Sequence, residues 1–337
     1  EHRFADNWHR ARSADWPRVH VPFLTAANWG GQGLHPRGNF AGFTQAASTQ
    51  KWLEVHGDAH WTHFYTDYGL GLQRAFFDHF LKGIDNGWDR RRRVTLNVRH
   101  PGERFEVRME DEWPLARTDW QKWHLDLANG GFLASPGERQ QATYHALGDG
   151  VTLTTAPLAE PMEITGPLAA KLFISSSTRD ADFFLIVRVF DPAGSEVVFM
   201  GALDPCTPIA QGWLRASHRQ LDPERSRFYQ PYHPHQAEEP LTPGEICEVD
   251  IEILPTCIVV PAGYRVALTI RGRDYQYGGE LPAFAHRFYY ASRGVGPFTH
   301  TGSDDRPPEV FGGDVTIHAG AGLDSYLLVP VIPARAG

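Results

Sequence analysis

The spacing of hydrophobic residues in the first third of the chain predicts strands that alternate with helices. The apolar run at residues 19–27 (VHVPFLTAA) predicts a buried parallel strand, and residues 52–56 (WLEVH) predict a second strand. Residues 39–47 predict a short helix between these strands, and residues 67–82 predict a longer helix after them. Strands and helices in this order are typical of a doubly wound α/β sheet.

The helix predicted at residues 67–82 (DYGLGLQRAFFDHFLK) has the clearest ends. Asp67 is the expected N-cap, and Gly83 is the expected stop because glycine readily adopts the left-handed conformation found at helix ends. Three aromatic side chains of this helix are expected in the core because they share its apolar stripe or its flank. They are Phe76, Phe77 and Phe80.

The helical spacing disappears after about residue 94, and short alternating runs predict strands instead. The first two lie at residues 94–99 and 105–108. After residue 151 the strand-like runs are VTLTT, LAAKLFIS, DFFLIVRVF, EVVFM, GWLRASHR, CEVDIEI, YRVALTIRG, DVTIHA and SYLLVPVI. Many short strands separated by proline and glycine predict a β-sandwich of the jelly-roll type. The polar residues 130–150 are expected to form a loop between the two parts.

Composition and charge limit the classes of function. The chain has 337 residues, of which 42% are hydrophobic and 21% charged, so a globular protein of two domains is expected. The net charge is −8, and the one basic cluster, at residues 90–93, predicts a solvated loop, so nucleic acid is not expected as a partner. No apolar stretch approaches about 18 residues, and no signal peptide pattern begins the chain. Three cysteines without metal-type spacing predict thiols in a reducing compartment, and therefore a cytoplasmic protein.

Three histidines in the stretch KWLEVHGDAHWTH form the most notable polar cluster: His56, His60 and His63. Their spacing could suggest zinc ligands, but a glycine follows His56 and the segment leaves a strand instead of forming a helix. Neither a metal site nor a cofactor is therefore expected, and His56 and His63 are expected to be structural. His35 follows the first strand, where active-site loops of α/β sheets gather, and a turn-stabilising role is expected for it.

Several longer motifs resemble one known family. The order PFLTAANW, KWLEVHGDAH and QRAFFDHFLKGIDNGW resembles the C-terminal part of the α/β-hydrolase domain in the CocE/NonD hydrolases, which are cocaine esterase-like and related to X-prolyl dipeptidyl peptidases. The stretches ITGPLAAKLFISSSTRDADFF, GWLRASHR and LTPGEICEVDIEI resemble the C-terminal jelly roll of the same family. The resemblance implies α/β plus all-β architecture: residues 1–108 as the C-terminal part of an α/β-hydrolase sheet, and residues 109–337 as a galactose-binding-like jelly-roll β-sandwich. At the entrance to the sandwich, Trp113, Trp120 and Trp123 are expected to pack the domains together.

The resemblance also implies a reaction and a catalytic residue. Members of the family are serine hydrolases, which cleave ester or amide bonds through an acyl-serine, and His60 matches their catalytic histidine. No GxSxG motif occurs in this sequence, so the nucleophile half of the enzyme is expected to be missing and the isolated chain inactive. Gly30 and Gly31 stand where the family has its catalytic acid, which leaves Asp58 and Asp67 as the nearest substitutes.

The sequence is also compatible with other functions. The sandwich could belong to a carbohydrate-binding or other ligand-binding jelly-roll protein, or the glycine pair could mark a catalytically degenerate hydrolase. A small ester or amide and the missing hydrolase half are the expected partners. Association with further copies of the chain, the identity of the substrate, the choice between ester and amide, and the natural extent of the chain are not determined by the sequence.

Overall fold

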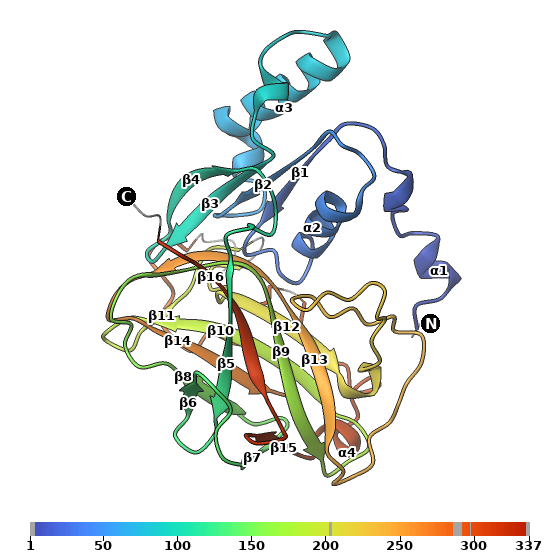
Figure 1. The fold of residues 1–337 in the computed structure, drawn as a ribbon, viewed down its shortest axis with the longest axis vertical. Helices are drawn as coiled ribbons and strands as arrows, with labels where there is room; N and C mark the ends of the chain where they lie inside the picture. Colours follow the sequence, from blue (N-terminus) through green and yellow to red (C-terminus); the bar gives the residue numbers. More distant parts are fainter. Residues whose placement is uncertain (1–3, 202–203, 286–291, 297, 335–337) are drawn as a thin grey trace.

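The computed structural model describes residues 4–201, 204–285, 292–296 and 298–334. Its helices are α1 (Asn7–Arg10), α2 (Pro36–Gln45), α3 (Asp67–Lys82) and α4 (Pro308–Phe311). Its strands are β1 (Phe23–Asn28), β2 (Lys51–His56), β3 (Val94–His100), β4 (Arg104–Glu110), β5 (Asp119–Asp126), β6 (Gly131–Leu133), β7 (Gln140–His145), β8 (Val151–Thr154), β9 (Met162–Ser176), β10 (Asp182–Phe190), β11 (Glu196–Val197), β12 (Ala210–Arg215), β13 (Cys247–Val260), β14 (Arg265–Arg271), β15 (Asp314–Ala319) and β16 (Tyr326–Ile332). The protein is mostly β with few helices (Figure 1).

The first 110 residues form a small sheet with helices on both faces. Strands β1, β2 and β3 run parallel, and β4 returns antiparallel to β3. Because side chains alternate along a strand, Leu53 of β2 packs on one face with Phe40 of α2, and Trp52 packs on the other with Phe76 of α3. The same alternation brings Glu54 to the α3 face, where Glu54 and His56 of β2 line a cavity together with side chains of α3.

Helix α3 has the predicted bounds, with two differences in detail. Gly83 ends it in the left-handed conformation at φ 68°, as predicted. The N-cap is Thr66 and not Asp67, since the Thr66 hydroxyl accepts the Gly69 backbone N–H at 3.3 Å. The expectation for Phe77 was wrong: Phe76 is buried, but Phe77 is 50% exposed because it lies beyond the face that the sheet covers.

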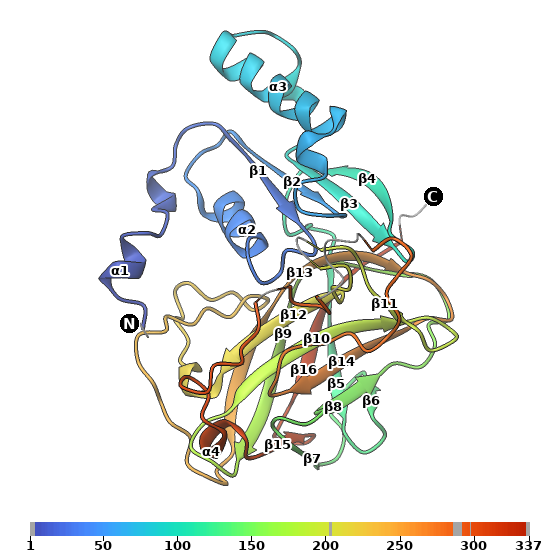
Figure 2. The same cartoon turned by 180° about the vertical axis from the view of Figure 1, so that it is seen from behind.

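The remainder of the chain is mostly β, as predicted, and this sandwich part is seen from behind in Figure 2. Strand β13 pairs antiparallel with β9 along most of its length, and β10 pairs with β12 and β14. The inward-facing side chains of these strands make the largest hydrophobic core of the described residues. Strand β13 also pairs in parallel with β3, where Ile258 lies opposite Arg99. Strand pairing therefore connects the small sheet to the rest of the chain.

The loop predicted at residues 130–150 is wrong, because this stretch contains β6 and β7. Strand β7 pairs antiparallel with β15 along its whole length. Its sequence QQATYH buries Tyr144 and leaves most of the other side chains at least partly exposed. A strand with so few apolar residues does not show the alternation that sequence patterns detect.

The three tryptophans expected to pack the domains together behave differently. Trp113 meets this expectation, because its ring stacks on Phe40 of α2 at 4.9 Å between centroids. For the other two the expectation was wrong, since their ring contacts lie within the sandwich part. Trp120 stacks on Tyr229 at 5.1 Å, and Trp123 packs against Phe132 at 5.5 Å.

Candidate active site around His60

The loop that carries His60 is held in one conformation by its neighbours. Asn28, at the end of β1, donates side-chain hydrogen bonds to the carbonyls of Gly57 and Asp58, at 3.3 and 2.7 Å. A Cβ at Gly57 would lie 2.0 Å from the ring of Phe105, so only glycine fits there. Asp58 has φ 59°, a left-handed conformation that aspartate tolerates better than most residues. These contacts fix the chain direction just before His60.

The ring of His60 is half-buried against another histidine. Its centroid lies 4.6 Å from that of His35, with 26° between the planes. Burial lowers the pKa of His60, and the neighbouring His35 and His56 lower it further, so the ring is neutral near pH 7. The Nδ1 atom of His60 is buried without a hydrogen-bond partner in the part of the chain that the structure describes. His35 makes no side-chain cap on α2; its ring stacks on His60 instead.

Neither aspartate considered as a substitute acid acts on His60 in this structure. Within the described ranges, no carboxylate is among the groups that shift the pKa of His60. The charge of Asp58 acts instead on His56 and His63. Asp67 is exposed in the first turn of α3. The ring of His60 is therefore positioned here by stacking and burial.

A buried acid and base pair beside His60 was not anticipated from the sequence. Glu54 accepts a hydrogen bond from Nδ1 of His56 at 2.8 Å, and these two side chains are only 4% and 7% exposed. The Nε2 atom of His56 donates to the carbonyl of His60 at 3.3 Å. Burial lowers the pKa of His56, but the hydrogen bond and charge of Glu54, together with the His60 carbonyl and the charge of Asp58, outweigh it and raise the pKa above its ordinary value. A charged imidazolium can donate to the Glu54 carboxylate and to the His60 carbonyl at the same time.

His63 completes the cluster as a packing residue. Its ring stacks on His56 at 5.0 Å and meets Tyr68 edge-on at 5.8 Å. Burial lowers the pKa of His63, and the neighbouring His56 adds to this effect. Among the residues that the structure describes, no three His, Cys, Asp or Glu side chains come together in a way that could hold a metal ion.

A cavity of about 510 Å³ opens beside His60. Its walls are mainly apolar, with Phe64 and Phe77, each about half exposed, on the α3 side. Glu54 and His56 line its floor. A neutral imidazole at the edge of an apolar cavity can accept a proton from a hydroxyl group placed there.

Comparison with known proteins identifies relatives of this chain. A family model described as the X-Pro dipeptidyl-peptidase C-terminal non-catalytic domain matches residues 86–285. A CocE/NonD family hydrolase of solved structure from Staphylococcus aureus is similar over 98% of this chain, with 30% identity and a TM-score of 0.85. A candidate serine esterase of Mycobacterium bovis is 32% identical over 183 residues, which is 52% of this chain. The cocaine esterase of a Rhodococcus species is 25% identical over 246 residues, which is 60% of this chain.

The similarity covers only part of each relative. The chain spans 57% of the Staphylococcus aureus hydrolase, 38% of the cocaine esterase and 27% of the Mycobacterium bovis protein.

The structure contains no helix, within its described residues, that is long and apolar enough to cross a lipid bilayer.

Proposed function

We propose that this chain forms part of a serine hydrolase for ester or amide bonds. The premise is that the chain belongs to the X-Pro dipeptidyl-peptidase C-terminal domain family and is the C-terminal part of a CocE/NonD protein. Residues 1–108 would supply the last strands of an α/β-hydrolase sheet, and residues 109–337 the jelly roll. The parallel strands β1, β2 and β3, with α2 and α3 on opposite faces, support the first assignment.

The observation that carries the proposal is the neutral His60 on a fixed loop at the edge of an apolar cavity. In the proposed reaction His60 takes the proton of a serine hydroxyl as the serine oxygen bonds to the acyl carbon of the substrate. His60 then gives this proton to the leaving alcohol or amine as its bond to the acyl carbon breaks. Water hydrolyses the acyl-serine by the same steps, with His60 again acting as base and then as acid.

The serine in this proposal comes from outside residues 1–337, because the sequence contains no GxSxG elbow. The stacking of His35 on His60 takes over the orienting role that a carboxylate has in an ordinary triad. The relatives named as esterases and hydrolases support an acyl-transfer reaction of this kind.

A comparison of two proteins tests the proposal. The first is the chain of 337 residues, and the second is the same protein expressed with its upstream coding sequence. We expect only the longer protein to hydrolyse p-nitrophenyl acetate and to be labelled by a serine-directed fluorophosphonate. Turnover by the shorter chain that the fluorophosphonate abolishes would overturn the placement of the serine. An unlabelled and inactive longer protein would indicate a degenerate hydrolase.

A further inference from the structure

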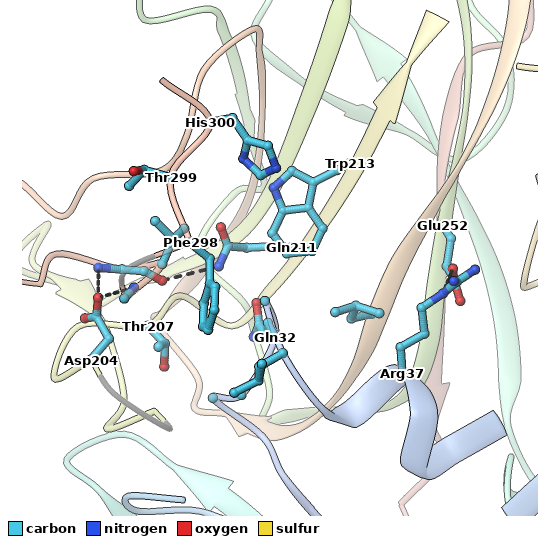
Figure 3. A pocket seen from close by; sticks show the side chains of 18 of the residues that line it. Gln32, Arg37, Asp204, Thr207, Gln211, Trp213, Glu252, Phe298, Thr299 and His300 are labelled. Atoms are coloured by element: carbon cyan, nitrogen blue, oxygen red, sulfur yellow. Dashed lines mark hydrogen bonds and ion pairs between the residues drawn. The ribbon is translucent and has the colours of Figure 1, made fainter. Parts of the chain in front are cut away.

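A second cavity lies between the loop that follows β1 and the sandwich, and the proposed hydrolase reaction does not use it. Its volume is about 590 Å³, which falls within the range of small-molecule sites. Its walls come from residues 30–34, strands β12 and β13, and residues 294–296 and 298–300 (Figure 3). None of its lining residues lines the cavity beside His60. Leu34 lines this second cavity while its neighbour His35 stacks on His60, so the loop lies between the two.

The wall formed by residues 294–296 and 298–300 is held in place by two buried aspartates. Asp204 is 2% exposed and accepts the backbone N–H groups of Gly294 and Gly296 at 2.6 and 2.8 Å. Asp274 is 8% exposed and accepts the backbone N–H of His300 at 2.6 Å and its Nδ1–H at 2.9 Å. The cavity is therefore preformed on this side, which lowers the entropy cost of binding a ligand.

Gln32 supplies an acceptor without a partner. It is 5% exposed, and its Nε2 lies 3.2–3.4 Å from the backbone carbonyl oxygens of Trp29, Pro208 and Ile209. Three acceptors around this atom fix the orientation of the amide, because an oxygen in its place would be repelled. The Oε1 atom is then buried with no hydrogen-bond partner among the described residues. A ligand group that donates a hydrogen bond would satisfy it.

His300 presents a second ring nitrogen in the same wall. The carboxylate of Asp274 receives the Nδ1–H, and in the tautomer that carries its proton there the Nε2 atom can accept a hydrogen bond. Figure 3 shows this ring beside the indole of Trp213, at the opposite side of the cavity from the ion pair of Arg37 and Glu252.

Two aromatic side chains and an ion pair also line the cavity. Trp213 and Phe298 present their rings around the space that Gln32 borders (Figure 3). Arg37 and Glu252 neutralise each other through an ion pair of 2.8 Å. We propose that this cavity binds a small, uncharged aromatic molecule that carries a hydroxyl group, with the ring against Trp213 and Phe298 and the hydroxyl donated to Oε1 of Gln32.

Two probes that share a ring system, of which one can donate a hydrogen bond and the other cannot, test this site on the chain of 337 residues. We expect 2-naphthol to bind about tenfold more tightly than 2-methoxynaphthalene, which has the same ring system but cannot donate, when both are titrated by nuclear magnetic resonance. In Gln32→Leu the two probes should bind equally. In Trp213→Leu both should bind more weakly than to the original chain. His20→Ala is the control, since His20 is exposed and does not line the cavity.

If Gln32→Leu fails to fold, the two probes still test the site, because both can be titrated against the original chain. Equal binding of the two probes to the original chain would overturn the proposed hydrogen bond. Binding of both that Trp213→Leu leaves unchanged would place them elsewhere and overturn the site. His300→Ala separates the two acceptors: retained preference for 2-naphthol assigns the hydroxyl to Gln32, and a lost preference contradicts that assignment.

Discussion

Glu54 and His56 form a buried ionic pair that supports the loop carrying His60. Both lie on the α3 face of β2, and His56 reaches the backbone of His60 with the ring nitrogen that Glu54 does not occupy. Removing one partner of such a pair leaves the other charge buried and unpaired, which costs several kcal/mol. The pair therefore couples the stability of β2 to the conformation of the His60 loop.

We expect Glu54→Gln to lower the free energy of unfolding more strongly in mild acid than in alkali. The pKa of His56 is raised in the folded state, so its stabilising contribution is present below the unfolded value of about 6.5 and is lost as pH rises through the folded value. The loss should be about 3 kcal/mol near about pH 6 and smaller near about pH 9. Urea unfolding at both pH values measures it.

Glu160→Gln is the control for this prediction, because Glu160 is an exposed carboxylate. It should change the free energy of unfolding little at either pH. A loss in Glu54→Gln that is the same at both pH values would contradict a charged pair.

Some features of single residues around His60 were predicted from the sequence, and others were not. The sequence predicted that His60 follows a strand, which the structure confirms, and it showed Gly30 and Gly31 where the family resemblance led us to expect an acid. The pairing of Glu54 with His56 was not predicted, because a glutamate in an alternating strand is normally expected to face solvent. The stacking of His35 on His60 was also missed, since two separate loops bring the rings together.

The hairpin of β3 and β4 connects the His60 loop to the sandwich through Glu103. This residue has φ 56° at the turn, and its carboxylate accepts the backbone N–H of Met200 at 2.9 Å. Burial raises the pKa of Glu103 to about 7, and the charge of Asp58 contributes in the same direction. The hairpin thus holds a carboxyl group that changes its charge near neutral pH.

We expect Glu103→Gln to stabilise the chain above neutral pH. The folded carboxyl keeps its proton between the ordinary value of 4.5 and about 7, whereas the unfolded one loses it, so the original chain loses stability as pH rises through this window. Glutamine avoids this loss and should be more stable by about 2 kcal/mol near about pH 8, with the difference shrinking toward about pH 5. Thermal or urea unfolding across this range measures the difference.

Glu106→Gln, an exposed change on the neighbouring strand, should show no such pH dependence. Parallel stability curves for the original chain and Glu103→Gln would contradict the raised pKa.

Elements with a strong hydrophobic period were predicted well, and elements without one were missed. The bounds of α3 were predicted from its apolar stripe and Gly83, and β10 from its continuous apolar run DFFLIVRVF. Strand β7 was missed because tertiary pairing with β15, and not its own apolar residues, makes it a strand. The α2 helix begins three residues earlier than predicted, at Pro36, a residue type that suits the first turn of a helix.

At the scale of the whole molecule, Arg99 joins the small sheet to the sandwich. It lies on β3, is fully buried, and donates hydrogen bonds to the carbonyls of Cys257 and Ile209 at 3.1 and 3.0 Å. Its guanidinium lies 4.7 Å from the ring centroid of Phe199. Burial lowers its pKa to about 10, so Arg99 stays charged near neutral pH.

We expect Arg99→Met to lower the free energy of unfolding by about 3 kcal/mol, because carbonyls of the sandwich lose their donor in a buried site. The two parts should also unfold less cooperatively, which fluorescence and circular dichroism followed in the same urea titration would detect. Arg104→Met on the exposed side of the same hairpin is the matched control. Coincident transitions with unchanged stability would contradict the joining role of Arg99.

One kinetic comparison tests most directly the proposed role of His60 as the base of a serine hydrolase. The protein expressed with its upstream coding sequence is assayed for kcat/KM with p-nitrophenyl acetate, alongside His60→Ala and the control His20→Ala. We predict a loss of at least about 1,000-fold in His60→Ala and no change in His20→Ala. Equal activity of His60→Ala and the original protein would contradict this role.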